Sequence, residues 1–178
     1  GKRSCPVEKF LKLLDSPEIA LYSLQKDVPE EENACLQGRD RLQDLQSQLL
    51  DFADTAAAIA QLDLVITVDT AVAHLAGAMG KRTWILLAHV PDWRWLLDRD
   101  DNPWYPTARL FRQVAPNAWD DVFARVVEAL RAELAPAPAS PPPLIPPSPA
   151  ASPPILPLTG FNRIKQCRHG FLLHNVND

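Results

Sequence analysis

Residues 62–80 read LDLVITVDTAVAHLAGAMG and decide the fold. Residues 62–68 are apolar and often β-branched, except for Asp63 and Thr67, in a run too short for a helix and too apolar for a half-exposed strand. Residues 71–79 are nearly all small residues that a helix tolerates, and Gly80 ends the run. The stretch therefore predicts a buried strand of a parallel sheet that leads directly into a helix.

Two polar residues, Asp69 and Thr70, stand between this strand and this helix. Their side-chain oxygens are expected to accept hydrogen bonds from the first amide groups of the helix. In open α/β sheets such a junction lies where ligands bind, and a helix amino terminus attracts phosphate. His74 follows one helical turn later, so its ring should reach the region of the Asp69 carboxylate. The sequence predicts an anion site here, with a tightly packed helix and a partly buried histidine as the alternative.

Small residues keep the predicted helix slim, so its backbone can come close to a neighbour. The sequence leaves open whether that neighbour is the sheet or a ligand. The small residues are Ala71, Ala73, Ala76, Gly77 and Ala78.

The pattern from Asp69 to Gly80, D-T-A-x-A-H-L-A-G-A-x-G, resembles the D-[ST]-G-x-x-H-x-A motif of glycosyltransferase family 9, the heptosyltransferase-like enzymes. Residues 83–113 extend the resemblance to the carboxyl-terminal portion of bacterial tetratricopeptide-repeat proteins that carry such a region. The resemblance covers roughly residues 1–134. It implies an α/β fold, a partial Rossmann-like lobe of GT-B type in which a parallel sheet with flanking helices holds a nucleotide-sugar donor. Ala71 stands where the family has Gly, which restricts φ and narrows the space for a diphosphate.

The resemblance also implies donor-binding residues near the start of the chain. Arg3 and Ser4, in RSCPV, match an R-S-x-P-L stretch that lies beside the donor phosphates in the family. A solvated basic terminus is the alternative. Gln25 and Lys26 follow a predicted strand over residues 19–24, at the end where ligands bind. Lys26 is expected to pair with phosphate as a point charge, although a surface lysine in a turn is the commoner case.

Carried over from the family, each of these residues has an implied role. Thr70 and the Ala71 amide hold phosphate, Arg3 and Lys26 neutralise it, and His74 donates a hydrogen bond. Asp69 orients His74 or caps the helix rather than acting as a base. No catalytic residue is assigned.

The loop over residues 89–106, HVPDWRWLLDRDDNPWYP, is rich in tryptophan and arginine. Trp93 or Trp95 is expected to stack on a base or sugar, and Arg94 to pair with phosphate or with Asp98. In the alternative interpretation, the loop is packed and its tryptophan rings fill the gap between the lobes.

The other predicted elements are strands over 83–88 and 108–113 and a closing helix over 119–134 with an apolar face. Asp54 is expected to cap a short helix over 55–61. Within residues 38–50, Leu42, Leu45 and Leu49 fit a helical period, whereas the family resemblance implies a short strand near residues 42–45.

Composition excludes several classes of function. Lys and Arg total 18 against 22 for Asp and Glu, with no basic cluster, so a nucleic-acid partner is not expected. No apolar run approaches the roughly 18 residues of a membrane span and no signal peptide is evident, so we expect a soluble, cytoplasmic protein. Cys5, Cys35 and Cys167 form no C-x-x-C pair, and we predict no disulfide framework, no metal site and no cofactor.

Residues 135–160 are dominated by proline, alanine and serine and are predicted to be a disordered linker. Residues 161–178, FNRIKQCRHGFLLHNVND, resemble the opening of FkbM-type methyltransferase domains. The three parts are therefore a donor lobe (1–134), the linker (135–160) and the start of a methyltransferase-like segment (161–178). We expect a fragment, cut at both ends, of a longer glycosyltransferase–methyltransferase polypeptide.

The function predicted from the sequence is donor binding by one lobe of a glycosyltransferase that is inactive as this isolated chain. Its partners would be a nucleotide sugar, an acceptor that is a glycan or a protein, and the remainder of the parent polypeptide. The alternative is a non-catalytic interaction module of a tetratricopeptide-repeat protein.

Overall fold

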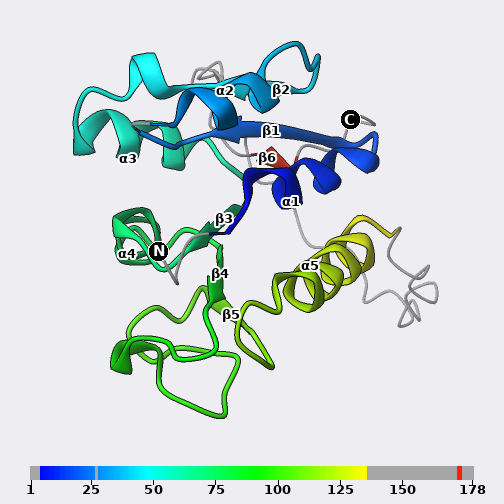
Figure 1. Cartoon of the computed structure of the whole chain (residues 1–178). Coiled ribbons are helices and arrows are strands. Elements are labelled where there is room, and N and C mark those ends of the chain that lie inside the picture. Colours follow the sequence, from blue (N-terminus) through cyan, green and yellow to red (C-terminus); the bar gives the residue numbers. More distant parts are fainter. Residues whose placement is uncertain (1–4, 27, 136–171, 174–178) are drawn as a thin grey trace, which may run out of the picture.

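The computed structural model describes residues 5–26, 28–135 and 172–173, which form an α/β fold of two small sheets with flanking helices (Figure 1). One sheet has the order β2–β1–β6 and the other the order β3–β4–β5. All pairs are parallel except β1 with β6. The strands are β1 (Ile19–Ser23), β2 (Leu42–Asp44), β3 (Val65–Val68), β4 (Thr83–Leu87), β5 (Ala108–Arg112) and β6 (Leu172–Leu173). The predicted fold class is confirmed.

The helices over 52–60, 71–78 and 119–134 agree with the sequence pattern except at some ends, whereas the sequence did not predict the helix over 30–36. The α-helices are α1 (Val7–Leu11), α2 (Glu30–Leu36), α3 (Phe52–Ala60), α4 (Ala71–Ala78) and α5 (Trp119–Leu134). Short 3-10 turns are η1 (Lys12–Asp15), η2 (Gln46–Gln48) and η3 (Trp93–Trp95). The ambiguous stretch over 38–50 contains the short strand β2, as the family resemblance implies, followed by a 3-10 turn and no α-helix.

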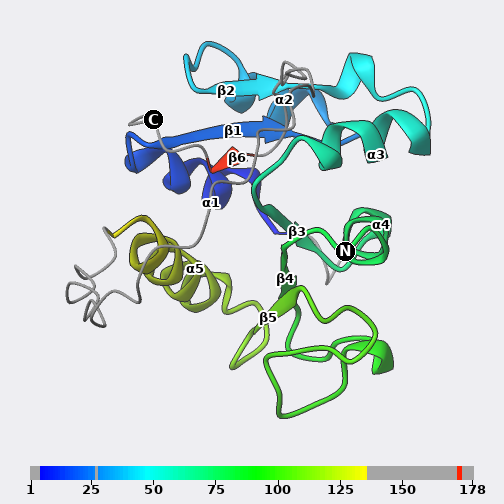
Figure 2. The ribbon, with the colours of Figure 1, turned by 180° about the vertical axis from the view of Figure 1, so that it is seen from behind.

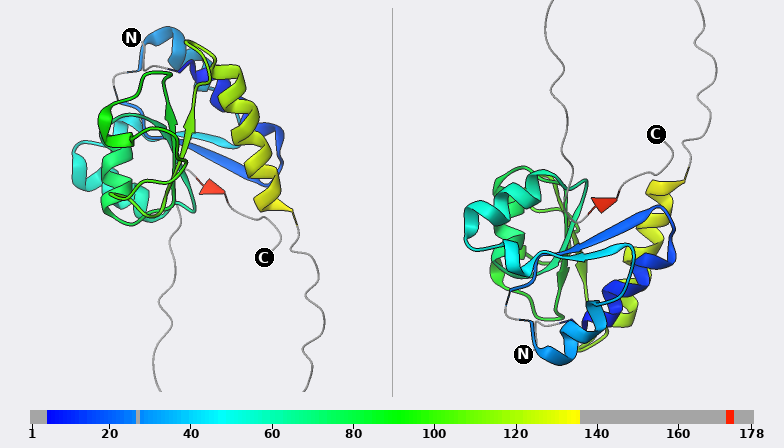
Figure 3. Two further views of the ribbon diagram at one scale, coloured as in Figure 1. Left: turned by 90° about the horizontal axis from the view of Figure 1, so that it is seen from below. Right: turned by 90° about the horizontal axis from the view of Figure 1, so that it is seen from above.

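Strand β4 lies at the centre of the core, with all five of its residues buried. Trp84 and Leu86 pack with Val122 and Val126 of α5, while Ile85 and Leu87 pack with Ala73 of α4 on the other face. This alternation places α4 and α5 on opposite sides of the β3–β4–β5 sheet (Figure 3). The sheet is therefore covered on both faces, as its apolar strands predict.

The two sheets are not joined by hydrogen-bonded strands among the described residues, because β3 is an edge strand of its sheet. In Figure 2, β1 and β2 lie at the top of the molecule and β3 lies below them. The parallel sheet that the sequence predicts is therefore present as two separate sheets in the described part of the chain.

The predicted cap of the helix before β3 was wrong. Asp51, not Asp54, is the N-cap of α3, and its carboxylate accepts hydrogen bonds from the amides of Ala53 and Asp54 at 2.7 and 2.9 Å. The Asp54 side chain accepts in return from the Asp51 amide, which completes a capping box. The helix begins three residues earlier than predicted because two aspartates three positions apart share the cap.

No helix in the described part of the chain is long and apolar enough to cross a membrane. The predicted linker lies outside the described residues apart from Ala135. The methyltransferase-like segment lies outside them apart from β6. Arg3, Ser4 and Cys167 are also outside.

The capping box gives a first test of the fold. Replacing Asp51 by Ala removes the acceptor for two amides at the start of α3, and the free energy of unfolding should fall by about 1 kcal/mol. Chemical denaturation measures the change. Asp63→Ala, at an exposed aspartate outside any cap, is the control and should change stability by less than about 0.5 kcal/mol. Equal losses in the two variants would contradict the assigned cap.

Candidate functional site

The candidate site lies where β3 ends and α4 begins. Thr70 is the N-cap of α4, but its side chain makes no capping hydrogen bond. Its hydroxyl instead lies 3.2 Å from the Thr67 hydroxyl. The predicted capping role of the Thr70 side chain was therefore wrong. The Thr70 hydroxyl therefore accepts no hydrogen bond from the first amide groups of α4.

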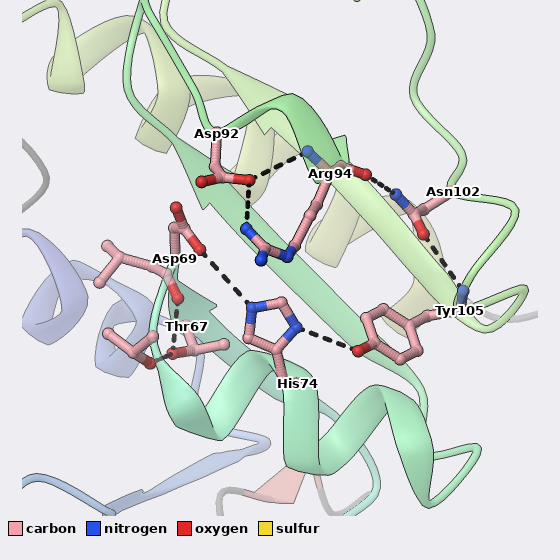
Figure 4. A network of polar contacts seen from close by, with 9 residues as sticks. Thr67, Asp69, His74, Asp92, Arg94, Asn102 and Tyr105 are labelled. Atoms are coloured by element: carbon pink, nitrogen blue, oxygen red, sulfur yellow. Dashed lines mark hydrogen bonds and ion pairs between the residues drawn. The ribbon is translucent and has the colours of Figure 1, made fainter. Parts of the chain in front are cut away.

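His74 is held from several directions (Figure 4). Its Nδ1 lies 3.0 Å from the Tyr105 hydroxyl, and its Nε2 lies 4.0 Å from Oδ1 of Asp69. The imidazole also stacks on the Trp95 ring, with centroids 5.1 Å apart and an interplanar angle of 20°. The Asp69 side chain is only 10% exposed. The structure thus brings Asp69 and His74 together, and these contacts fix the orientation of the imidazole.

Gly77 makes room for Tyr105. A Cβ built on Gly77 would lie 2.5 Å from Cγ of the Tyr105 ring, closer than any real Cβ contact. The slim face of α4 therefore receives an aromatic ring from the segment before β5. This answers the question that the small residues leave open, since at Gly77 the helix approaches a side chain of the same chain. Sequence reasoning did not identify Tyr105, because the two positions are distant in the chain.

Asn102 is a second residue that sequence reasoning missed. It is only 2% exposed, its amide nitrogen donates to the Arg94 carbonyl at 3.0 Å, and its oxygen accepts from the amides of Trp104 and Tyr105. These bonds connect Arg94 with Trp104 and Tyr105 inside the long loop that follows β4. They also position the Tyr105 backbone, and through it the hydroxyl that contacts His74. A polar side chain in a loop gives no sequence signal for such a role.

The tryptophan and arginine residues of this loop have separate environments. Trp95 is buried at 0% exposure beneath His74, so it fills the core and offers no free face. Trp93 is 68% exposed. Arg94 forms an ion pair with Asp92 at 2.9 Å and lies over the Trp93 ring at 4.8 Å. The prediction that Arg94 pairs with Asp98 was wrong. Asp92, two residues before Arg94, accepts hydrogen bonds from both the guanidinium and the amide of Arg94.

Gln25 and Lys26 follow β1 and line the same groove as Thr70 and Ala71. Both side chains are exposed, and the Lys26 ammonium donates to the Leu50 carbonyl at 3.0 Å. The structure therefore brings four of the predicted donor-binding residues to one groove. His74 and Asp69 lie on the adjacent side of the same helix terminus.

Cys5 lines the groove but is not a reactive nucleophile. Burial raises the pKa of the Cys5 thiol to about 12, so this thiol is protonated at neutral pH and is a poor nucleophile. In the described ranges, no group of three or more His, Cys, Asp or Glu side chains could hold a metal ion.

Part of the chain is similar to a known family of transferases. Residues 14–95 match glycosyltransferase family 9 (heptosyltransferase). This family 9 segment contains β1, β3, α4 and Trp95 but ends before Asn102 and Tyr105. The segment is glycosyltransferase-like, as the sequence motif predicts. The tetratricopeptide-repeat and methyltransferase resemblances remain predictions.

The chain is also similar to Protein FlbA of Caulobacter vibrioides. The two are 31% identical over 135 residues, which are 74% of this chain and 22% of that protein. The chain therefore spans about a fifth of the length of this curated relative. No solved structure matches the chain significantly.

Gly77 provides a test of the packing at the site. Gly77→Ala should lower the free energy of unfolding by about 1–3 kcal/mol, because the new methyl group displaces the Tyr105 ring. In a Tyr105→Ala background the same change should be neutral or stabilising, because alanine is the better helix former. A double-mutant cycle of denaturation free energies measures this coupling. Additive effects would show that the two residues do not compete for space.

Proposed function

We propose that the described α/β lobe binds the diphosphate of a nucleotide-sugar donor at the amino end of α4. The observation that carries the proposal is the placement of Thr70 and Ala71. They begin an eight-residue helix directly after β3, and they share a groove with Gln25 and Lys26. Helix amino termini at the carboxyl ends of strands attract phosphate through amide groups and the helix dipole. The match to family 9 supports a sugar nucleotide as the source of that phosphate.

The charges around the helix terminus suit this ligand in part. Lys26 is the cation that lines the groove, and its ammonium can keep its bond to the Leu50 carbonyl while two further hydrogens contact phosphate. The Asp69 carboxylate would repel a phosphate. However, this side chain is nearly buried and its Oδ1 lies on the side of His74. A protonated His74 would pair with that carboxylate and offset its charge. Asp69 therefore acts in the proposal as the partner that orients His74.

In the proposed reaction, an acceptor hydroxyl forms a bond to the anomeric carbon while the bond from that carbon to the diphosphate breaks. The hydroxyl proton passes to a base that this lobe does not supply. The lobe contributes fixed dipoles and cations that stabilise the negative charge on the departing diphosphate. The chain alone is then a donor-binding part of a larger enzyme. The acceptor, a glycan or a protein, would be bound by the remainder of that polypeptide.

Replacing Thr70 by Ala tests the donor site directly. Titration calorimetry with uridine, adenosine and guanosine diphosphates should show affinity weaker by roughly fivefold or more, because a hydrogen bond to a charged phosphate is lost. The melting temperature should change little, because the Thr70 hydroxyl caps no helix amide.

Thr107→Ala is the matched control for this variant. Its hydroxyl donates to the Lys81 carbonyl at 2.9 Å, away from the groove, so affinity for the diphosphates should stay unchanged. If the unaltered chain binds none of the three diphosphates at millimolar concentration, the proposal is wrong.

A further inference from the structure

The two ring nitrogens of His74 have different surroundings (Figure 4). Nδ1 lies 3.0 Å from the Tyr105 hydroxyl, which is hydrogen-bond distance. Nε2 lies 4.0 Å from Oδ1 of Asp69, which is beyond that distance. One face of the ring stacks on Trp95, yet the His74 side chain is still 38% exposed. Nε2 is therefore the nitrogen that keeps its hydrogen-bonding capacity for a ligand.

The partners of the imidazole decide which nitrogen carries the proton in its neutral form. One ring nitrogen is then a donor and the other an acceptor. With the proton on Nδ1, the lone pair of Nε2 would face the Asp69 carboxylate, and the two would repel each other. With the proton on Nε2, its N–H faces that carboxylate and Nδ1 accepts from the Tyr105 hydroxyl. Asp69 and Tyr105 therefore favour the same tautomer from opposite ends of the ring.

The Tyr105 ring is held in the place where this bond forms. Gly77 leaves the space that the ring occupies, since a Cβ at that position would overlap it. The side-chain oxygen of Asn102, which is only 2% exposed, accepts from the Tyr105 amide at 3.2 Å. The rings of Tyr105 and Trp95 lie 6.2 Å apart, tilted by 45°. Packing and backbone bonding thus direct the Tyr105 hydroxyl at His74.

The loop that supplies both aromatic rings keeps a strained backbone beside the histidine. Leu96, directly after Trp95, has a φ of 54° and a ψ of -174°. Residues other than glycine rarely adopt this conformation, and it persists only where surrounding contacts impose it. One such contact is the bond from the Arg112 guanidinium to the Trp95 carbonyl. Strain of this kind is concentrated at functional sites, so it supports a role for the loop beyond packing.

We propose that Tyr105 is a positioning residue that holds neutral His74 in the tautomer with its proton on Nε2. In this form, His74 donates a hydrogen bond from Nε2 to an anionic oxygen of the diphosphate. The other tautomer would present a lone pair to that oxygen and repel it. The assignment of the tautomer stands on the geometry of the chain, whereas the contact with the diphosphate rests on the proposed function.

Tyr105→Phe tests the tautomer, because it removes the hydroxyl and keeps the ring beside Gly77. Long-range proton–nitrogen correlation spectra of the histidine-labelled chain identify the protonated nitrogen, and His74→Gln assigns the His74 signals. At a pH where this ring is neutral, the unaltered chain should show Nε2–H as the main tautomer. In Tyr105→Phe the tautomer ratio should move roughly threefold or more toward Nδ1–H, because the hydrogen bond to Nδ1 is lost.

Tyr22→Phe is the matched control, because it removes the same hydroxyl group from β1, in the other sheet. It should leave the His74 signals unchanged. A main tautomer with its proton on Nδ1 in the unaltered chain would overturn the proposal. The same tautomer ratio in the unaltered chain and in Tyr105→Phe would also overturn it.

Calorimetric titration with the three nucleoside diphosphates separates this inference from the proposed function. Tyr105→Phe should weaken the binding seen in the unaltered chain by roughly twofold or more, and it should have no effect in a His74→Gln background. Equal losses in both backgrounds would show that Tyr105 does not act through His74 and would overturn the positioning role. If no diphosphate binds the unaltered chain, the proposed function is wrong, while the spectra still decide the tautomer.

Discussion

Burial of β4 on both faces is the constraint on which the other positions depend. A strand whose every side chain is buried needs a covering layer above and below, because each face would otherwise expose apolar surface to water. One layer is α5, which is long and strongly amphipathic. The other is α4 with Trp95, where Ala73 and Gly77 allow close approach. The chemistry of the site follows from this packing, because the same helix that covers β4 carries His74 and begins at Thr70.

Packing and polar contacts then act together on His74. Trp95 lies beneath the imidazole as part of the core, and Tyr105 reaches it over Gly77. Asn102 fixes the backbone of Tyr105 from the loop that follows β4. A change at Asn102 or Gly77 would therefore reach His74 without touching a ligand. The imidazole is preorganised by residues from three parts of the chain, which is the arrangement that a binding or transferring group requires.

The elements of the fold were predictable because their signals are local. Apolar runs such as TWILL and the apolar face of residues 119–134 identify β4 and α5 without tertiary information. The position of His74 near Asp69 follows from helical spacing for the same reason. The cap of α3, the partner of Arg94 and the partner of Gly77 were not predictable. Several aspartates lay within reach of the first two, and Tyr105 meets Gly77 only in the folded chain.

The separation of the two sheets also bears on how tightly a donor could bind. Gln25 and Lys26 follow β1, whereas Thr70 and Ala71 follow β3, and no ladder of hydrogen bonds links these strands in the described chain. Their relative position depends on side-chain packing across the groove, which resists sliding less than a hydrogen-bonded register does. A ligand that contacts both sides must then spend part of its interaction energy on ordering them.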